Sequence, residues 1–194
     1  MKIQRSRRQF SASEYWRMEE LGFFTGQRVE LLNGDIVAMP PQSNWHAIGI
    51  SYTSFALESI FNRNRYWIRI QNTLDLSPLS IPDPDIAVIE GGAMLWAKTR
   101  KNPKSALLIV EVSETTLADD RARKGRLYAA AGIADYWILN LVEGVLEIHR
   151  DPVSDPSHEL GCGYSKIDVL KPGEFASPLA APNGQIAIAD LLPG

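Results

Sequence analysis

The sequence predicts an α/β (mixed α+β) fold, in which a central mixed β-sheet is flanked by α-helices and preceded by an N-terminal helix and hairpin. Two observations support this fold class. The segments follow one another in the order helix, hairpin, helix, strands, helix, strands, which favours helices packed on one sheet. In addition, Ser105–Val112 is an apolar run of the kind found in a central strand that is covered on both faces.

The composition predicts one compact domain. The chain has 194 residues, of which 45% are hydrophobic and 22% are charged, and a chain of this size buries a core without disulfides. We assign residues 1–10 to a basic N-terminal arm and residues 11–194 to the domain. The single cysteine, Cys162, has no internal partner, and no segment resembles a secretory signal or a membrane span. We therefore expect a cytoplasmic protein.

The charge balance leaves two interpretations open. A net charge of −3 differs from the basic balance that is usual for nucleic-acid binders. Basic residues nevertheless cluster at Lys2–Arg8, at Lys98–Lys104 and at Arg121–Arg126. Each cluster is either a solvated surface or a set of phosphate contacts.

The N-terminal part of the chain predicts a helix, a hairpin and a second helix. Asn33-Gly34 between two apolar runs is the strongest local signal for a tight hairpin turn, so we expect a hairpin over Arg28–Met39. Serine and asparagine are favoured helix N-caps, and they precede both helical patterns. The expected helices run from Ser11 or Ser13 to near Gly22, and from Ser43 or Asn44 to about Phe61.

The rest of the chain predicts mainly strands. Alternating prolines in Ile81–Pro84 exclude a helix there. A helical period over Leu117–Ala131, followed by Gly132, predicts the long helix of this half. The other expected elements are strands at Trp67–Leu76, Asp85–Ile89, Ser105–Val112, Tyr136–Leu139, Val145–His149, Tyr164–Val169 and Gln185–Ile188, and a short helix at Ala93–Arg100. Tyr136 and Trp137 are expected in the core.

Two acidic residues interrupt apolar strand patterns. Alternate residues of a strand share a face, so Glu111 shares a face with Ile109, and Asp85 with Ala87. A buried carboxylate is costly unless it is paired, hydrogen-bonded or bound to a metal. Two carboxylates from neighbouring strands form an oxygen-rich site suited to Mg²⁺. The alternative for Glu111 is that its strand has already reached the surface, and Asp83 is interpreted as a turn residue.

A lysine lies on the inward face of the long helix. Steps of about 100° per residue place Lys124 in one stripe with Asp120, Leu127 and Tyr128. Its ammonium is either directed at the two carboxylates or, alternatively, reaches solvent or pairs with Asp120. A metal-dependent phosphodiesterase site needs acidic metal ligands and a nearby cation. The chain supplies them in a suitable order: a strand with Asp, a strand that ends in Glu, and a helix with an inward Lys.

These residues also carry a resemblance to known proteins. Pro84-Asp85 followed by Glu111-Val112-Ser113 resembles the PD-(D/E)XK signature of restriction endonuclease-like proteins, with Ser113 in the place of its lysine. A longer set resembles the Uma-type restriction endonuclease family, in which the lysine has moved to the following helix, as Lys124 matches. This set, within residues 10–150, comprises Val29–Gly34, Pro40-Pro41, His46, Ile109–Ser113, Asp120, Lys124, Tyr128, Gly132 and Asp135–Ile138.

The resemblance implies a restriction endonuclease-like core and a metal-dependent endonuclease that hydrolyses phosphodiester bonds in DNA. The implied catalytic residues are Asp85, Glu111, Lys124 and Glu30. The implied Mg²⁺, which Mn²⁺ can replace, is held by Asp85, Glu111, the Val112 carbonyl and Glu30. Asp120, Ser113, His46 and Tyr128 are expected around this site. A homodimer is implied by the same resemblance.

Several roles remain open at this stage. Glu30 is alternatively an exposed strand charge, and His46 a helix cap or packing residue. Lys124 positions the attacking water or, if burial depresses its pKa, acts as general base. His149 and His158 have no ligand-like neighbours in the sequence, so no zinc site is expected.

Two other functions compete with the nuclease. One is a catalytically silent nuclease-fold protein that binds nucleic acid or a protein partner, and the other is a metal-dependent hydrolase or structural oligomer unrelated to nucleic acid. The acidic net charge favours these two, whereas the presence of Asp85, Glu111 and Lys124 together favours the nuclease.

Overall fold

The computed structural model describes residues 7–194, and most of the expected basic arm lies outside the described residues. The centre of the fold is a six-stranded sheet in the order β3-β4-β5-β6-β7-β8. Strands β5 and β6 are parallel, whereas all other neighbours are antiparallel, which confirms the predicted mixed sheet. The strands are β3 (Tyr66–Ile70), β4 (Ile86–Glu90), β5 (Leu108–Ser113), β6 (Asp135–Asn140), β7 (Val145–Ser154) and β8 (Cys162–Leu170).

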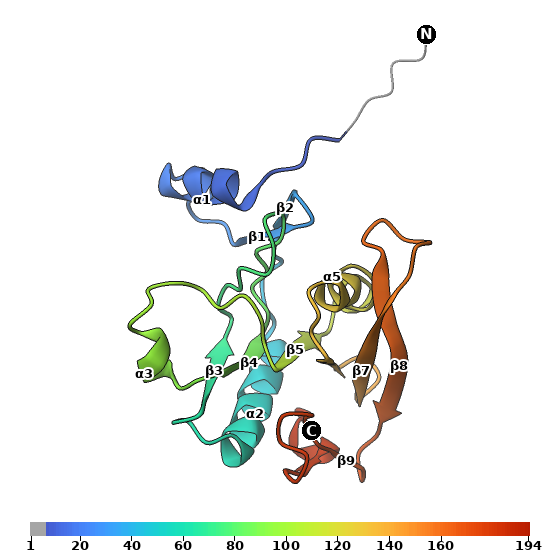
Figure 1. The fold of residues 1–194 in the computed structure, drawn as a ribbon. Helices are drawn as coiled ribbons and strands as arrows, with labels where there is room; N and C mark the ends of the chain where they lie inside the picture. The colour runs from blue at the N-terminus through green and yellow to red at the C-terminus, as the bar shows by residue number, and fades with distance from the viewer. Residues whose placement is uncertain (1–6) are drawn as a thin grey trace.

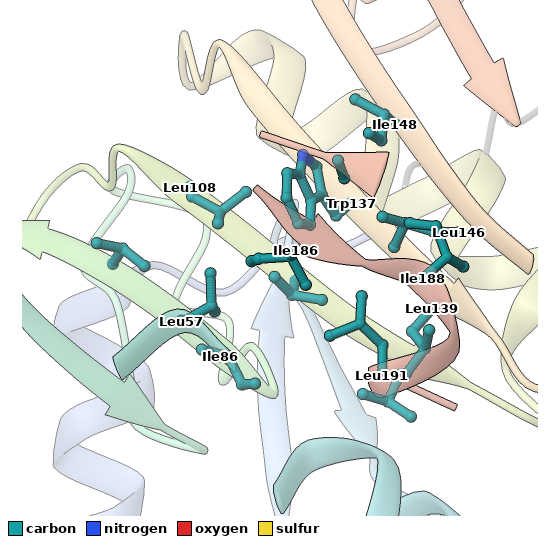
Figure 2. Close-up of a cluster of buried hydrophobic side chains, with 14 of the residues drawn as sticks. Leu57, Ile86, Leu108, Trp137, Leu139, Leu146, Ile148, Ile186, Ile188 and Leu191 are labelled. Carbon is teal, nitrogen blue, oxygen red and sulfur yellow. The ribbon is translucent and has the colours of Figure 1, made fainter. Parts of the chain in front are cut away.

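Helices cover both faces of this sheet (Figure 1). On one face lies α2 (Asn44–Ile60), and its inner residues pack against buried side chains of the sheet and of the C-terminal segment (Figure 2). The other face is covered by α5 (Gly125–Ala130), over a second apolar cluster. Tyr136 and Trp137 lie on opposite faces and are both fully buried, as predicted. The C-terminal segment contains β9 (Phe175–Ala176), β10 (Ile186–Ala187) and η2 (Ile188–Asp190).

The N-terminal helix and hairpin form a separate small layer above the sheet (Figure 1). Ser11 and Glu14 form a capping box at the start of α1 (Ala12–Glu20). The hairpin consists of β1 (Val29–Leu32) and β2 (Asp35–Ala38). Between them Asn33 and Gly34 have φ of 50° and 81°, the positive values that a tight hairpin turn requires. Backbone hydrogen bonds between Leu31 and Ile81 attach the hairpin beside the start of β4.

The predicted helix Leu117–Ala131 is not a regular α-helix. It consists of α4 (Leu117–Asp119), the π-helical turn η1 (Asp120–Lys124) and α5. The Gly125 N–H donates to the Asp120 carbonyl five residues earlier, and the Tyr136 hydroxyl donates to the same carbonyl at 3.0 Å. This tertiary hydrogen bond stabilises a wider turn that helical periodicity does not encode.

Other boundaries differ from the prediction for local reasons. Strand β3 ends at Ile70, because Gln71 has a φ of 51° and leaves the extended conformation. Helix α3 (Ala93–Trp96) is shorter than predicted. Strands β7 and β8 are longer, because they pair with each other past Pro152, which signals a turn in the sequence. Between residues 7 and 194, no helix has the length and apolar character needed to span a bilayer.

Candidate active site

Strand pairing brings the two predicted carboxylates together. Ile86 of β4 lies opposite Val110 of β5, so that Asp85 and Glu111 are neighbours across the two strands. The Asp85 N–H donates to Glu111 Oε2 at 3.4 Å. Both residues are buried, with exposed fractions of 6% and 3%. The alternative in which the strand surfaces at Glu111 is therefore wrong.

Lys124 points inward from η1 onto these groups. Its Nζ lies 3.0 Å from Glu111 Oε1 and 3.2 Å from Glu30 Oε1. Only 8% of Lys124 is exposed, which excludes a lysine that reaches into solvent. The carboxylate of Asp120 instead accepts hydrogen bonds from Ser113 Oγ at 2.7 Å and from the Thr116 hydroxyl at 2.6 Å.

Glu30 reaches the site from the hairpin. Because side chains alternate along β1, Leu31 packs toward α1, while Glu30 faces the pocket. Its Oε1 also accepts the Asp83 N–H at 3.1 Å. Glu30 is 3% exposed, so the alternative of an exposed strand charge is wrong, and its carboxylate helps to hold the Lys124 ammonium.

Three donors fix the carboxylate of Asp85. The Val112 N–H donates to Oδ2 at 2.9 Å, His46 Nε2 donates to the same oxygen at 3.0 Å, and Gln71 Nε2 donates to Oδ1 at 3.1 Å. The backbone N–H of His46 is bonded to the N-cap residue Ser43, so the start of α2 places the imidazole in the site. Gln71 was missed by the sequence prediction, because nothing in its local sequence distinguishes it from a loop residue.

Tyr128 completes the contacts around Glu111. Its hydroxyl donates to Glu111 Oε1 at 2.6 Å, and its ring packs near Tyr136. The residues expected around the site, which are Asp120, Ser113, His46 and Tyr128, therefore all lie at it. The acidic and basic groups line a pocket of about 210 Å³. Its other walls are the end of β2 with the loop that follows it, Val37–Gln42, and residues of the segment Glu114–Asp119.

The pocket holds more buried acid than base. Four buried carboxylates, of Glu30, Asp85, Glu111 and Asp120, surround one buried ammonium. Burial raises the pKa of Glu111 well above its ordinary value, and the nearby Asp85, Asp120 and Glu30 raise it further. Burial also raises the pKa of Glu30 and of Asp120. A cation in this pocket would offset the excess negative charge.

The charges around Lys124 favour one of its two expected roles. Burial acts to lower the pKa of Lys124, but the attraction of Glu111, Glu30 and the other carboxylates outweighs it and raises the pKa above the ordinary value. Lys124 therefore keeps its proton. This favours the role in which Lys124 positions the attacking water over the general-base role, which requires a depressed pKa.

The basic cluster Arg121–Arg126 is engaged within the molecule. Arg121 binds Glu147 of β7 at 2.6 Å, Arg123 binds Asp35 of β2 at 2.7 Å, and Arg126 binds Asp155 at 2.6 Å. Each arginine thus attaches a different element to the helical segment. The three arginines of this cluster therefore form internal ion pairs, and phosphate contacts by them stay a prediction.

The fold is that of a restriction endonuclease-like protein. The family model of Uma2, described as "Putative restriction endonuclease", matches residues 12–189, and the chain belongs to this family. The chain is also similar to a crystal structure of a putative nuclease belonging to DUF820 from Anabaena variabilis, with a TM-score of 0.65. The two are 14% identical, and the match covers 94% of this chain and 97% of that one, so the likeness shows the fold alone. No curated protein matches the chain.

Proposed function

We propose that the protein is a Mg²⁺-dependent endonuclease that hydrolyses phosphodiester bonds in DNA. The observation that carries the proposal is the buried Lys124 ammonium between Glu111 and Glu30, with Asp85 on the adjacent strand. Membership of a family described as restriction endonucleases supports the reaction class. The single free cysteine supports a reducing compartment such as the cytoplasm.

The donor set fits a hydrated magnesium ion better than a cation enclosed by side chains. Among residues 7–194, no group of three or more His, Cys, Asp or Glu side chains is placed to hold a metal ion. Magnesium, however, usually keeps several waters and binds one or two carboxylates. Asp85 and Glu111 would supply these, and Glu111 Oε2 is free for this purpose because its one protein contact is long, at 3.4 Å.

The remaining expected ligands have other contacts. Glu30 Oε1 contacts Lys124, and the Val112 N–H, which is not the expected ligand atom, binds Asp85. A carbonyl ligand from Val112 and a direct or water-mediated ligand from Glu30 therefore stay predictions. When bound, the cation supplies an acidified water and offsets charge on the phosphoryl group.

Lys124 is suited to stabilise negative charge rather than to accept a proton. Its ammonium has three N–H donors, and Glu111 and Glu30 accept two of them. The third is available to a phosphate oxygen or to the attacking water. Because the neighbouring carboxylates keep Lys124 protonated, this donor carries a full charge in a buried site, where charge stabilisation is most effective.

Cleavage of a supercoiled plasmid in the presence of Mg²⁺ or Mn²⁺ tests the proposal. We expect Lys124→Met and Glu111→Gln to lower the cleavage rate by about 100-fold or more. Lys171→Met is the matched control, because Lys171 is an exposed lysine outside the pocket lining and outside the three basic clusters, and this variant should retain activity. Cleavage that persists in both site variants would assign the activity to a contaminant or to another site.

The same variants separate the nuclease from its main alternative. If the wild-type protein does not cleave DNA but still binds Mn²⁺ in isothermal titration, and Glu111→Gln abolishes the binding, the catalytically silent protein is favoured. If it neither cleaves DNA nor binds Mn²⁺, the metal-dependent nuclease is excluded.

A further inference from the structure

The π-helical turn η1 is held by a side chain of the sheet. The Asp120 carbonyl accepts one hydrogen bond from the Gly125 N–H and a second, at 3.0 Å, from the Tyr136 hydroxyl. Tyr136 is fully buried on β6, and its ring centroid lies 5.0 Å from that of Tyr128 and 6.0 Å from that of Tyr164. Burial raises the pKa of Tyr136 well above its ordinary value, so the hydroxyl keeps its proton and remains a donor to the turn.

Gly125 fits this turn because it has no side chain. A methyl group at this position would lie 3.3 Å from the Asp120 carbonyl oxygen and 3.6 Å from Cε1 of Tyr136. The first distance is tighter than an ordinary van der Waals contact, so a larger residue would push the carbonyl out of place. Turns of this kind occur frequently at functional sites. The residue at position 125 and the tertiary hydrogen bond thus both favour the wider turn.

The wider turn changes how Asp120 lies relative to Lys124. In a regular α-helix, an acidic and a basic residue four positions apart share a face and attract each other. The π-helical turn contains one residue more, which rotates the segment before it by about 100° relative to the segment after it. Among residues 7–194, the ion pairs of the Lys124 ammonium do not include Asp120. The carboxylate of Asp120 is bound instead by the hydroxyls of Ser113 and Thr116.

Lys124 keeps the α-helical register of α5. Its Nζ contacts Glu111 Oε1 at 3.0 Å, and the Tyr128 hydroxyl, four residues further along, donates to the same oxygen at 2.6 Å. An ammonium has three N–H donors, and Glu111 and Glu30 accept two of them. The turn therefore leaves Lys124 aligned with the site and keeps Asp120 from taking the third donor.

We propose that Tyr136 is a positioning residue for Lys124. By holding the π-helical turn, its hydroxyl keeps the Asp120 carboxylate off the ammonium, so that the third N–H donor remains available to a phosphate oxygen of the substrate. Without the hydroxyl, the turn closes to an α-helical one, in which Asp120 competes for this donor. The catalytic consequence rests on the proposed nuclease function, whereas the arrangement of the three side chains does not.

Steady-state kinetics of plasmid cleavage test the catalytic consequence in Tyr136→Phe, which loses the hydroxyl and keeps the ring. We expect kcat to fall about 10-fold or more, since a catalytic group misplaced by about 1 Å costs up to about 100-fold. The KM for DNA and the affinity for Mn²⁺ should stay unchanged, because the metal-binding carboxylates are not altered. Tyr164→Phe is the matched control, because the Tyr164 hydroxyl also donates to a backbone carbonyl, that of Ile133 at 2.8 Å, but outside η1. An unchanged kcat, an equal fall of kcat in both variants, or a parallel loss of Mn²⁺ affinity in Tyr136→Phe would overturn the proposal.

Crystal structures of two variants test the arrangement without any activity. In Tyr136→Phe, we expect the Gly125 N–H to donate to the Arg121 carbonyl, as in an α-helix, and the Asp120 carboxylate to lie within about 4 Å of Lys124 Nζ, the distance of an ion pair. Gly125→Ala should give the same change, because its methyl group crowds the Asp120 carbonyl, and it replaces Tyr136→Phe should that variant not fold.

A π-helical turn that persists in these variants, with Asp120 still away from Lys124, would show that the Tyr136 hydroxyl does not set the arrangement. A wild-type protein that does not cleave DNA would remove the proposed function. The two structures would then still decide whether Tyr136 keeps Asp120 off the ammonium.

Discussion

At the scale of single residues, the surroundings of Asp85 set its protonation state. Burial acts to raise the pKa of Asp85, but the hydrogen bond from His46 and the charges of His46 and Lys124 lower it below the ordinary value. Asp85 is therefore ionised, whereas its neighbour Glu111 has a raised pKa. Two adjacent carboxylates thus differ in their proton affinity, because donors and positive charges outweigh burial at Asp85, whereas burial and the neighbouring carboxylates dominate at Glu111.

His46 is expected to position Asp85 for cation binding. Replacing His46 by Ala removes one of the hydrogen bonds that orient the carboxylate, and losing such an orienting partner weakens metal binding by about 10–100-fold. Isothermal titration with Mn²⁺ measures this change. His158→Ala is the control, since His158 is exposed on the β7–β8 connection. An equal loss of affinity in both variants would show that His46 has no specific role at Asp85.

The sequence predicted the central residues of the site, because regular periods govern their directions. Glu111 interrupts a strand period and Lys124 a helix period, so both must face the interior on the same side of the sheet. No such rule applied to Gln71 or to the His46 side chain. Gln71 reaches Asp85 because its backbone turns there, with φ of 51°. His46 reaches Asp85 because the fold places the first turn of α2 beside it. Both depend on tertiary packing.

At the scale of elements, the contacts of Arg121, Arg123 and Arg126 could not be predicted from the sequence either. Their partners Asp35, Glu147 and Asp155 lie 88, 26 and 29 positions away in the chain. From the sequence alone, a cluster of basic residues therefore predicts a charged surface patch, because the acidic partners are brought close only by the fold. The π-helical turn η1 could not be predicted from the local sequence either, because it is stabilised by the hydroxyl of Tyr136, which lies on another element.

Arg123 is expected to hold the N-terminal hairpin in place over the site. It donates to Asp35 and to the Leu32 carbonyl, and the hairpin carries Glu30. A partly buried ion pair contributes up to about 1 kcal/mol, so Arg123→Ala should increase hydrogen exchange of the hairpin amides about fivefold. Cleavage should also slow, because Glu30 helps to hold Lys124.

The control for this experiment is Arg17→Ala. Arg17 forms an ion pair with Glu20, and both side chains are 66% exposed, so its loss should leave the exchange of the hairpin unchanged. Equal exchange in the Arg123→Ala protein and the wild-type protein would show that the backbone bonds between Leu31 and Ile81 suffice to hold the hairpin.

For the whole molecule, the layers could be predicted but the strand order could not. The apolar run of β5 predicted a strand covered on both faces, and β5 indeed lies inside the sheet between α2 and α5. The position of β3 and β8 at the two edges is decided by pairing between distant segments. A single sequence carries no direct signal for such pairing.

Glu147 links three parts of the molecule and is expected to make its stability depend on pH. Its carboxylate accepts hydrogen bonds from Arg121 of η1 at 2.6 Å and from Asn140 of β6 at 2.9 Å. Burial acts to raise the pKa of Glu147, but nearby His149 and the hydrogen bonds from Arg121 and Asn140 lower it from 4.5 to about 2. Hydrogen bonds to a buried charged group stabilise a fold by about 1–3 kcal/mol, so Glu147→Gln should lower the free energy of unfolding by this amount at neutral pH.

The sign of the pH effect follows from the depressed pKa. The folded protein binds the Glu147 proton more weakly than the unfolded chain does, so its contribution is complete above pH 4.5 and is lost as the pH falls toward about 2. The difference in urea-unfolding free energy between the wild-type protein and Glu147→Gln should therefore shrink across this range. Glu143→Gln is the matched control, because Glu143 contacts the same arginine but its side chain is 56% exposed, and its effect should be small at every pH. A Glu147→Gln difference that stays constant with pH would mean that the ion pair adds no net stability, and that packing alone holds η1 on β7.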